Sequence, residues 1–313
     1  MDLWRDDVHA TTLTVAIGFG CGSDLGRAAV EAAAAARGQL AHEAPQLALI
    51  VAAGDPHADL VPSVRSVLGQ IALAGGTTTG ILMPAGVFEH GVLVVAFAPD
   101  VTAESGAACV AAADLTDAGR SAARLVMAGW PFRLQYPRGL TIAFAASGTP
   151  ISFLGGWRQF TGPKMRTVCA VMPGRRVWGT PASAGLASVA CLEASYPTGL
   201  GLARGFAPGA RPHAGMLLYG AIEAATTALK RIDEHSTRLV MVFDTVARRH
   251  ALGAAVHGEQ WSEVLAEVGG RAPCVGWLCE RVAGYGRGVR PVDEHGALLV
   301  AALGESTPAG APE

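Results

Sequence analysis

Residues 47–53 read LALIVAA, an apolar run of strand length with no polar residue on either face. A strand with one face in water alternates apolar and polar residues, whereas a strand covered on both faces does not. This run therefore predicts a sheet buried between layers. The elements expected to follow it are a turn at 54–56, a helix over 60–70, a short strand over 71–74, a loop over 75–80 and a buried strand over 92–97.

The same order recurs near the C-terminus. Its elements are a strand over 239–243, a helix over 261–268, and strands over 273–278 and 298–303. Continuous apolar strands separated by helices are typical of α/β layering. We therefore expect an α/β fold of layered sheets covered by helices, in two related halves that duplicate a strand–helix–strand–strand block.

The rest of the chain is less regular. The segments between and before the two blocks predict a strand over 12–17, a turn over 18–22, a helix to residue 37, a helix over 117–129, strands over 140–146, 166–172 and 186–193, and a helix over 216–230. Five glycines and two prolines in 199–215 indicate a linker. The domain boundaries expected are 8–205 and 206–304, followed by a disordered tail over 305–313.

Composition excludes several classes of protein. The chain has 313 residues, is 50 % hydrophobic and carries a net charge of −2, so it has no general attraction for nucleic acid or anionic membranes. No uninterrupted apolar run reaches the roughly 18 residues that a spanning helix needs. The N-terminus shows no signal peptide and the six cysteines are scattered. These features predict a cytoplasmic protein with reduced thiols.

No strong catalytic or nucleotide-binding motif is present. Gly18–Gly22 has the spacing G-x-G-x-G rather than that of a dinucleotide-binding loop, which favours a tight turn. We expect a protein that is not an enzyme. The alternative is an uncharacterised enzyme that uses Cys279, Glu280 or His295.

Polar residues that follow buried strands are candidates for a ligand site. A loop of glycines and threonines offers free N–H groups to an anion, or forms a plain turn. Arginine at a strand end could hold a carboxylate, and Glu280 could accept from an amine. The candidate ligand-binding residues are Gly75, Gly76, Thr77, Thr78, Thr79, Arg248, Glu280 and His295. Arg249 and His250 belong to the same cationic cluster as Arg248.

Metal and heme are weaker candidates. Asp55, His57 and Asp59 could hold a metal, but a turn former and a helix cap explain two of them better. We expect no cofactor. Heme through His295, His250 or His257 is the alternative.

The ordered set of segments resembles the FIST family. In the N-terminal half the likeness lies in Ser23–Asp24 with the alanine-rich helix, in 47–53 with its helix, and in Ala74–Gly80. In the C-terminal half it lies in Val242–Arg248, Pro273–Glu280 and Glu294–Gly296. Three residues differ from the family's pattern, namely Thr245 for cysteine, Cys279 for glycine and Gly296 for asparagine.

The resemblance implies a sensory module of bacterial signal transduction. The expected function is to bind a small molecule, an amino acid or small carboxylate, and to signal through a partner protein. Heme or nitric oxide sensing is the alternative that the resemblance implies. Neither nucleic acid nor a membrane is expected as a partner.

Overall fold

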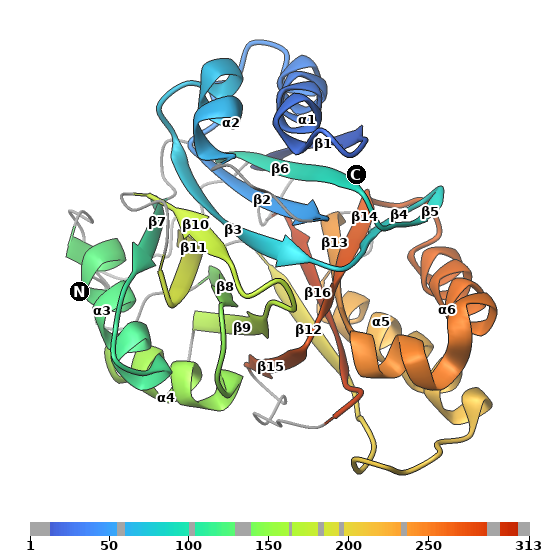
Figure 1. The fold of residues 1–313 in the computed structure, drawn as a ribbon. Coiled ribbons are helices and arrows are strands. Elements are labelled where there is room, and N and C mark those ends of the chain that lie inside the picture. The colour runs from blue at the N-terminus through green and yellow to red at the C-terminus, as the bar shows by residue number, and fades with distance from the viewer. Residues whose placement is uncertain are drawn as a thin grey trace, which may run out of the picture.

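The computed structural model describes residues 13–54, 60–99, 104–128, 139–162, 165–180, 185–193, 197–232, 237–286 and 295–305. Within these ranges, sixteen strands form three mixed sheets and six helices cover them (Figure 1). The α/β fold of layered sheets expected from the sequence is confirmed. None of the helices in this part of the chain combines the length and the apolar character needed to cross a bilayer.

The chain passes three times through one succession of elements. The first repeat contains β1 (Leu13–Cys21), α1 (Leu25–Gln39), β2 (Leu47–Ala53), α2 (Val61–Leu68), β3 (Ala72–Thr78), β4 (Ile81–Met83), β5 (Gly86–Phe88) and β6 (Gly91–Pro99). The second contains β7 (Glu104–Val110), α3 (Leu115–Ala128), β8 (Gly139–Ala145), α4 (Pro150–Thr161), β9 (Met165–Val171), β10 (Val177–Gly179) and β11 (Ala187–Glu193). The third contains β12 (Thr198–Ala203), α5 (Ala214–Leu229), β13 (Thr237–Thr245), α6 (Val246–Val268), β14 (Cys274–Cys279), β15 (Arg281–Tyr285) and β16 (Leu298–Gly304).

The duplication expected from the sequence is present in the first and third repeats. A third copy of the same succession lies between them. The sequence does not predict its helix α4, because Gly155 and Gly156 interrupt the helical pattern in the middle of that segment. The boundary predicted at 205/206 falls inside the third repeat, because β12 precedes it and pairs with β16, which follows it.

The four long strands of each repeat are arranged identically. Their orders are β1-β6-β2-β3, β7-β11-β8-β9 and β12-β16-β13-β14. Each sheet is then extended by a strand from another repeat: β10 pairs with β3, β15 pairs with β9, and β4 pairs with β14. This cyclic exchange covers edges that would otherwise be open and ties the three repeats into one body.

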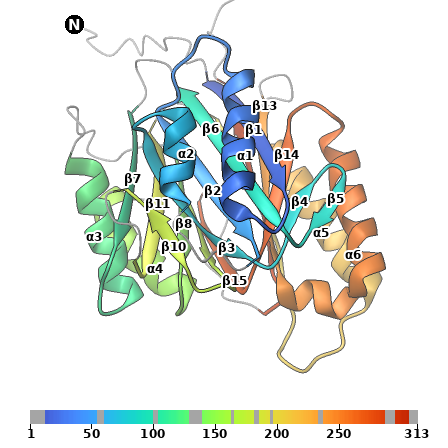
Figure 2. The ribbon, with the colours of Figure 1, turned by 45° about the horizontal axis from the view of Figure 1, so that its top comes forward.

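Each sheet has a helix-covered face and a central face. Helices α1 and α2 cover the first sheet, α3 and α4 the second, and α5 and α6 the third (Figures 1 and 2). The opposite faces of all three sheets meet in one central core, to which Phe97, Phe144 and Phe243 contribute. Burial on both faces explains why β2 and β16 read as continuous apolar runs.

Glycines bring two helices into direct contact with strand backbones. The turn expected at 18–22 is strand as far as Cys21, and the linker expected at 199–215 begins with β12. A Cβ at Gly199 or Gly201 would overlap the carbonyl oxygen of Ala228 or Ala224 in α5. Gly18 and Gly20 of β1 stand in the same relation to two alanines of α1. These glycines serve packing, so a turn or linker was the wrong interpretation.

A side chain at Gly201 should therefore be costly. We expect Gly201→Ala to lower the free energy of unfolding by about 1–3 kcal/mol, because α5 must move away from β12. Urea unfolding followed by circular dichroism measures this. The matched control is Gly38→Ala in α1, where nothing lies within 4 Å of the new Cβ and a helical alanine should add about 0.5–1 kcal/mol. Equal stability of the two variants would contradict the close contact.

Two further expectations need correction. The helix expected over 261–268 begins at Val246, and Gly253 (φ 74°) kinks it. The loop expected at 75–80 is strand as far as Thr78. A Cβ at Gly75 would overlap Ile50 O, so glycine permits the close pairing of β3 with β2. Of the disordered tail expected over 305–313, Glu305 accepts a hydrogen bond from Arg238 Nε over 2.7 Å, and residues 306–313 lie outside the described residues.

Candidate functional site

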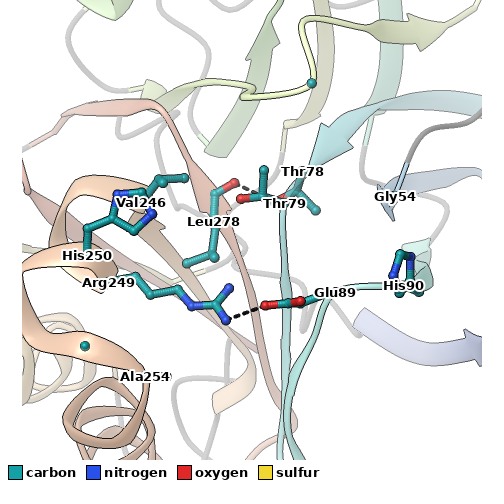
Figure 3. A pocket seen from close by; sticks show the side chains of 12 residues that line it. Gly54, Thr78, Thr79, Glu89, His90, Val246, Arg249, His250, Ala254 and Leu278 are labelled. Carbon is teal, nitrogen blue, oxygen red and sulfur yellow. Dashed lines mark hydrogen bonds and ion pairs between the residues drawn. The ribbon is translucent and has the colours of Figure 1, made fainter.

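A cavity of about 850 Å³ lies where strands β2, β3 and β14 end, beside the start of α6 (Figure 3). Open α/β sheets commonly bind ligands beyond the carboxyl ends of their strands. All three repeats contribute to the wall. The lining residues are Gly54, Thr78, Thr79, Glu89, His90, Gly174, Val246, Arg249, His250, Gly253, Ala254 and Leu278.

Helix periodicity decides which residues of α6 face this cavity. Val246, Arg249, His250 and Gly253 follow the i, i+3, i+4, i+7 spacing of one helix face. Thr245, the N-cap, makes no side-chain hydrogen bond to the helix, and the first turn has no acidic residue. The first turn of α6 therefore presents positive charge to the cavity.

An ion pair spans the cavity. The guanidinium of Arg249 donates from Nη2 to Oε1 of Glu89 over 2.7 Å, joining α6 of the third repeat to the segment between β5 and β6 of the first (Figure 3). The Arg249 side chain is 19 % exposed and that of Glu89 is 62 % exposed. Exposed pairs of this kind contribute about 0–1 kcal/mol. A ligand carboxylate could therefore compete with Glu89 for Arg249.

The predicted site residues on β3 have mostly structural partners. The N–H of Thr77 donates to Arg176 O over 3.0 Å, and that of Gly75 donates to Ser188 Oγ over 3.3 Å. Gly76 is buried against β10. These N–H groups therefore belong to the sheet and to its contact with β11, so the expected open N–H loop is absent. Thr79, by contrast, is exposed at the end of β3 and lines the cavity.

Thr78 fixes the shape of the cavity wall. Its hydroxyl donates to Leu278 O over 2.6 Å and accepts from the N–H of Gly80 over 3.2 Å. Leu278 N in turn donates to Gly80 O over 2.9 Å. These bonds hold the end of β3 against the end of β14, which keeps the two repeats in contact at the cavity.

Arg248, the neighbour of Arg249, lies in the protein interior. It is completely buried and donates from Nε to Gln260 Oε1 over 2.8 Å, from Nη1 to Gly296 O over 3.2 Å, and from Nη2 to Leu217 O. Burial lowers the pKa of Arg248, and the negative charge of Asp244 offsets part of that effect. Arg248 fastens the start of α6 to its surroundings and does not face the cavity.

A buried carboxylate balances Arg248. Oδ2 of Asp244 lies 2.9 Å from His257 Nε2 and accepts from Gln260 Nε2 over 2.9 Å, while Oδ1 accepts from the N–H of Thr245 over 2.7 Å. Gln260 thus connects the buried anion to the buried cation. The signal that could have revealed this network is a charged residue, Asp244, directly after the apolar run 239–243.

The remaining predicted residues lie elsewhere. Glu280 is exposed between β14 and β15, and its N–H donates to Val171 O over 2.8 Å. His295 is exposed beside Phe206 in a second pocket. The structure therefore gathers Thr78 and Thr79 with Arg249 and His250, and it separates them from Arg248, Glu280 and His295.

The sequence did not identify Glu89 and His90 as site residues. They form a charged and polar pair immediately before the buried strand β6. The signal is weak, because many surface turns have the same composition. Only the exchange of β4 into the third sheet carries this segment toward α6.

Cys279 is a poor nucleophile. It is fully buried, and burial raises its pKa well above the ordinary value, with further contributions from Asp244 and Cys169. The thiolate is the reactive form of cysteine. The enzyme alternative that relied on Cys279 is therefore disfavoured.

The residues considered as metal or heme ligands lie in different parts of the protein. The described residues contain no group of three or more metal-ligating side chains. Asp55, His57 and Asp59 lie outside those residues. His257 is buried, and its Nε2 lies 2.9 Å from Asp244 Oδ2, whereas His250 lines the cavity.

Comparison with known proteins supplies the family. The model of the FIST N domain matches residues 46–276, most of the chain. The chain therefore belongs to the FIST family, which is a family of sensory domains. The resemblance found in the sequence is thus confirmed. Among curated proteins, no sequence matches significantly.

Among the similar solved structures reported next, only the one with a TM-score above 0.5 supports the fold, and at 10 % identity it supports nothing more. A cyanuric acid hydrolase described as arising by structural concatenation is similar at a TM-score of 0.51 with 10 % identity, covering 94 % of this chain and 100 % of that one. The cyanuric acid hydrolase from A. caulinodans has a TM-score of 0.49 and 11 % identity, and the match covers 93 % of this chain and 99 % of that one. PurLQS from Thermotoga maritima has a TM-score of 0.32 and 9 % identity, and the match covers 96 % of this chain and 73 % of that one.

Proposed function

We propose that this protein is a cytoplasmic, small-ligand-binding sensory protein that takes an amino acid or small carboxylate in the 850 Å³ cavity and signals through a partner protein. The observation that carries the proposal is the pairing of Arg249 with an exposed carboxylate inside that cavity. Membership of a sensory domain family supports the signalling role.

The chemistry of the cavity suits a zwitterion. The planar guanidinium of Arg249 matches a carboxylate with two parallel hydrogen bonds, and the first turn of α6 adds a favourable dipole. On the other side, Glu89 could take an ammonium group once Arg249 turns to the ligand. His90 and His250 provide further hydrogen-bonding groups.

Binding of such a ligand would change a contact between repeats. The Arg249–Glu89 pair joins the third repeat to the first. A ligand that replaces Glu89 on Arg249 frees the segment between β5 and β6 from α6. A partner protein that recognises this segment would then read the state of the cavity.

The test is a calorimetric titration and thermal-shift screen of amino acids and small carboxylates. A binder at about 100 times its dissociation constant should add ~2.7 kcal/mol to the stability. We expect Arg249→Ala to weaken binding by roughly 10–100-fold, because one charge-assisted contact contributes ~1.5–3 kcal/mol. Arg27→Ala, at an exposed arginine of α1 whose partner is Glu31, should leave binding unchanged.

Two results would count against the proposal. One is the absence of stabilisation by any of these compounds at millimolar concentration. The other is a binder whose affinity is the same in Arg249→Ala as in the wild type, which would place its site elsewhere.

Heme binding is a second candidate. It is favoured by the presence of two histidines, His90 and His250, in the wall of one cavity. Hemin titration should then give a sharpened Soret band that His250→Ala weakens. An unchanged hemin spectrum would leave the carboxylate ligand as the surviving candidate.

A further inference from the structure

Helix α5 has an unusual composition for a helix at the surface. Its 16 residues, Ala214–Leu229, include one charged residue, Glu223. Helices at a protein surface normally carry charged residues along their outer face. The outer face of α5 instead presents Met216 and Tyr219, which are 60 % and 68 % exposed and are the two most exposed large apolar side chains that the structure describes. Because they are three positions apart, they lie side by side on the helix, and we name them the exposed pair.

The buried side of α5 fixes the direction in which the exposed pair points. Ala224 and Ala228 lie against the glycines of β12, where no Cβ could fit. Near the start of the helix, the carbonyl oxygen of Leu217 accepts from Nη2 of the buried Arg248. Both ends of the helix are therefore held by the protein interior, and the exposed pair stays at the surface. Exposed apolar side chains that are contiguous, rather than scattered, mark sites of protein contact.

The charged residues on the two sides of the exposed pair have opposite signs. Arg211 and His213 lie just before the helix, whereas Glu223 lies one turn after Tyr219. With a helical rise of about 1.5 Å per residue, His213 lies about 7 Å and Glu223 about 8 Å along the axis from the middle of the exposed pair. Arg211 and Glu223 form no ion pair with any other residue that the structure describes. Both charges are therefore available to a partner.

This order of charges is self-complementary. Two copies of α5 can lie antiparallel about a twofold axis through the middle of the exposed pair. Glu223 of one protomer then faces Arg211 and His213 of its partner, and the same contact occurs a second time. Tyrosine and methionine, the residue types of the exposed pair, are both enriched in protein interfaces. A partner of another sequence has no need to match this spacing, so the observations favour a second copy of this chain.

We propose that the outer face of α5 is the contact surface of a homodimer in which the two α5 helices pack antiparallel. This surface is separate from the cavity proposed for the ligand, and the dimer requires neither Arg249 nor a bound ligand. Contact through one helix from each copy buries a small area, and small interfaces are typically transient. We therefore expect monomer and dimer to exchange, with more dimer at higher concentration.

The test is sedimentation equilibrium of the full chain over a range of concentrations. The wild type should self-associate, and Tyr219→Arg should weaken that association by roughly tenfold or more, because it places a charge at the centre of the interface on both protomers. Leu125→Arg is the matched control, since Leu125 is 55 % exposed on α3 and lies outside the proposed surface. It should associate as the wild type does. Circular dichroism should show that both variants are folded.

Charge reversal tests the antiparallel arrangement. Glu223→Arg and Arg211→Glu should each self-associate less than the wild type, since like charges then meet at both ends of the interface. An equal mixture of the two variants should recover a dimer, because every facing pair then has opposite signs again. A variant that fails to fold cannot produce this recovery, so the mixture separates a lost contact from a lost fold.

A wild type that stays monomeric at every concentration would overturn the proposal. Self-association that Tyr219→Arg leaves unchanged would do the same, because the copies would then meet through another face. A mixture of the two charge variants that does not associate would rule out the antiparallel contact. A monomer that binds a different protein through Tyr219 would also overturn the proposal, since the occupant of this face would then be a signalling partner rather than a second copy.

Discussion

Replacing Arg248 by methionine is expected to lower the free energy of unfolding by about 3–5 kcal/mol. The substitution removes the donors for Gln260 Oε1, Gly296 O and Leu217 O. It also leaves the carboxylate of Asp244 buried without the cation that balances it. A single domain is commonly stable by only ~5–15 kcal/mol, so this loss should be visible as a large fall in the urea midpoint.

The neighbouring arginine is the matched control for this experiment. Arg249→Met, tested without ligand, removes only the ion pair to the exposed Glu89 and should change the stability by less than ~1 kcal/mol. Arg248→Lys keeps the charge but cannot reach three acceptors at once. We therefore expect its free energy of unfolding to lie between those of Arg248→Met and Arg249→Met. Similar urea midpoints for Arg248→Met and Arg249→Met would show that the buried network contributes nothing to stability.

Trp277→Ala is expected to cost about 3–5 kcal/mol of folding free energy. Trp277 is fully buried in the central core. Its ring meets Phe243 of its own sheet at 4.7 Å and Phe144 of the second sheet at 5.7 Å. Its backbone pairs with Ile81, which the first repeat donates. The cavity left by alanine would therefore weaken contacts among all three repeats. Thermal and urea unfolding measure the loss.

Trp277→Phe separates packing from hydrogen bonding. The indole Nε1 of Trp277 is buried and has no hydrogen-bond partner among the residues that the structure describes. Phenylalanine keeps most of the ring contacts and removes that unsatisfied donor, so we expect a change of less than ~1.5 kcal/mol. A cost for Trp277→Phe as large as that for Trp277→Ala would contradict this expectation, because it would show that the smaller ring of phenylalanine does not keep the packing of the indole.

Local sequence patterns were sufficient for the long apolar strands and several helices, but not for β7, β12 or the short strands. The runs 47–53 and 298–303 were identified as buried strands because every position in them is apolar. The helix α3 was found because its apolar residues recur with helical spacing. Helix α4 was missed, since its two adjacent glycines hide the pattern.

The candidate site was predicted only in part. Thr78 and Thr79 lie at the cavity, as expected of residues at a strand end. The choice between Arg248 and Arg249 depended on about 100° of helix rotation, which places one residue in the interior and the next in the cavity. A sequence that shows three consecutive basic residues does not reveal that rotation.

The sequence by itself determined the α/β class, the apolar strands and the family, because these depend on the order and polarity of neighbouring residues. Only the tertiary structure decided the exchange of β4, β10 and β15 among the three sheets. It also decided the helix contacts of Gly199 and Gly201 and the meeting of Glu89 with Arg249. Each of these joins residues that are far apart in the chain, and such pairings depend on how whole repeats pack rather than on any local pattern.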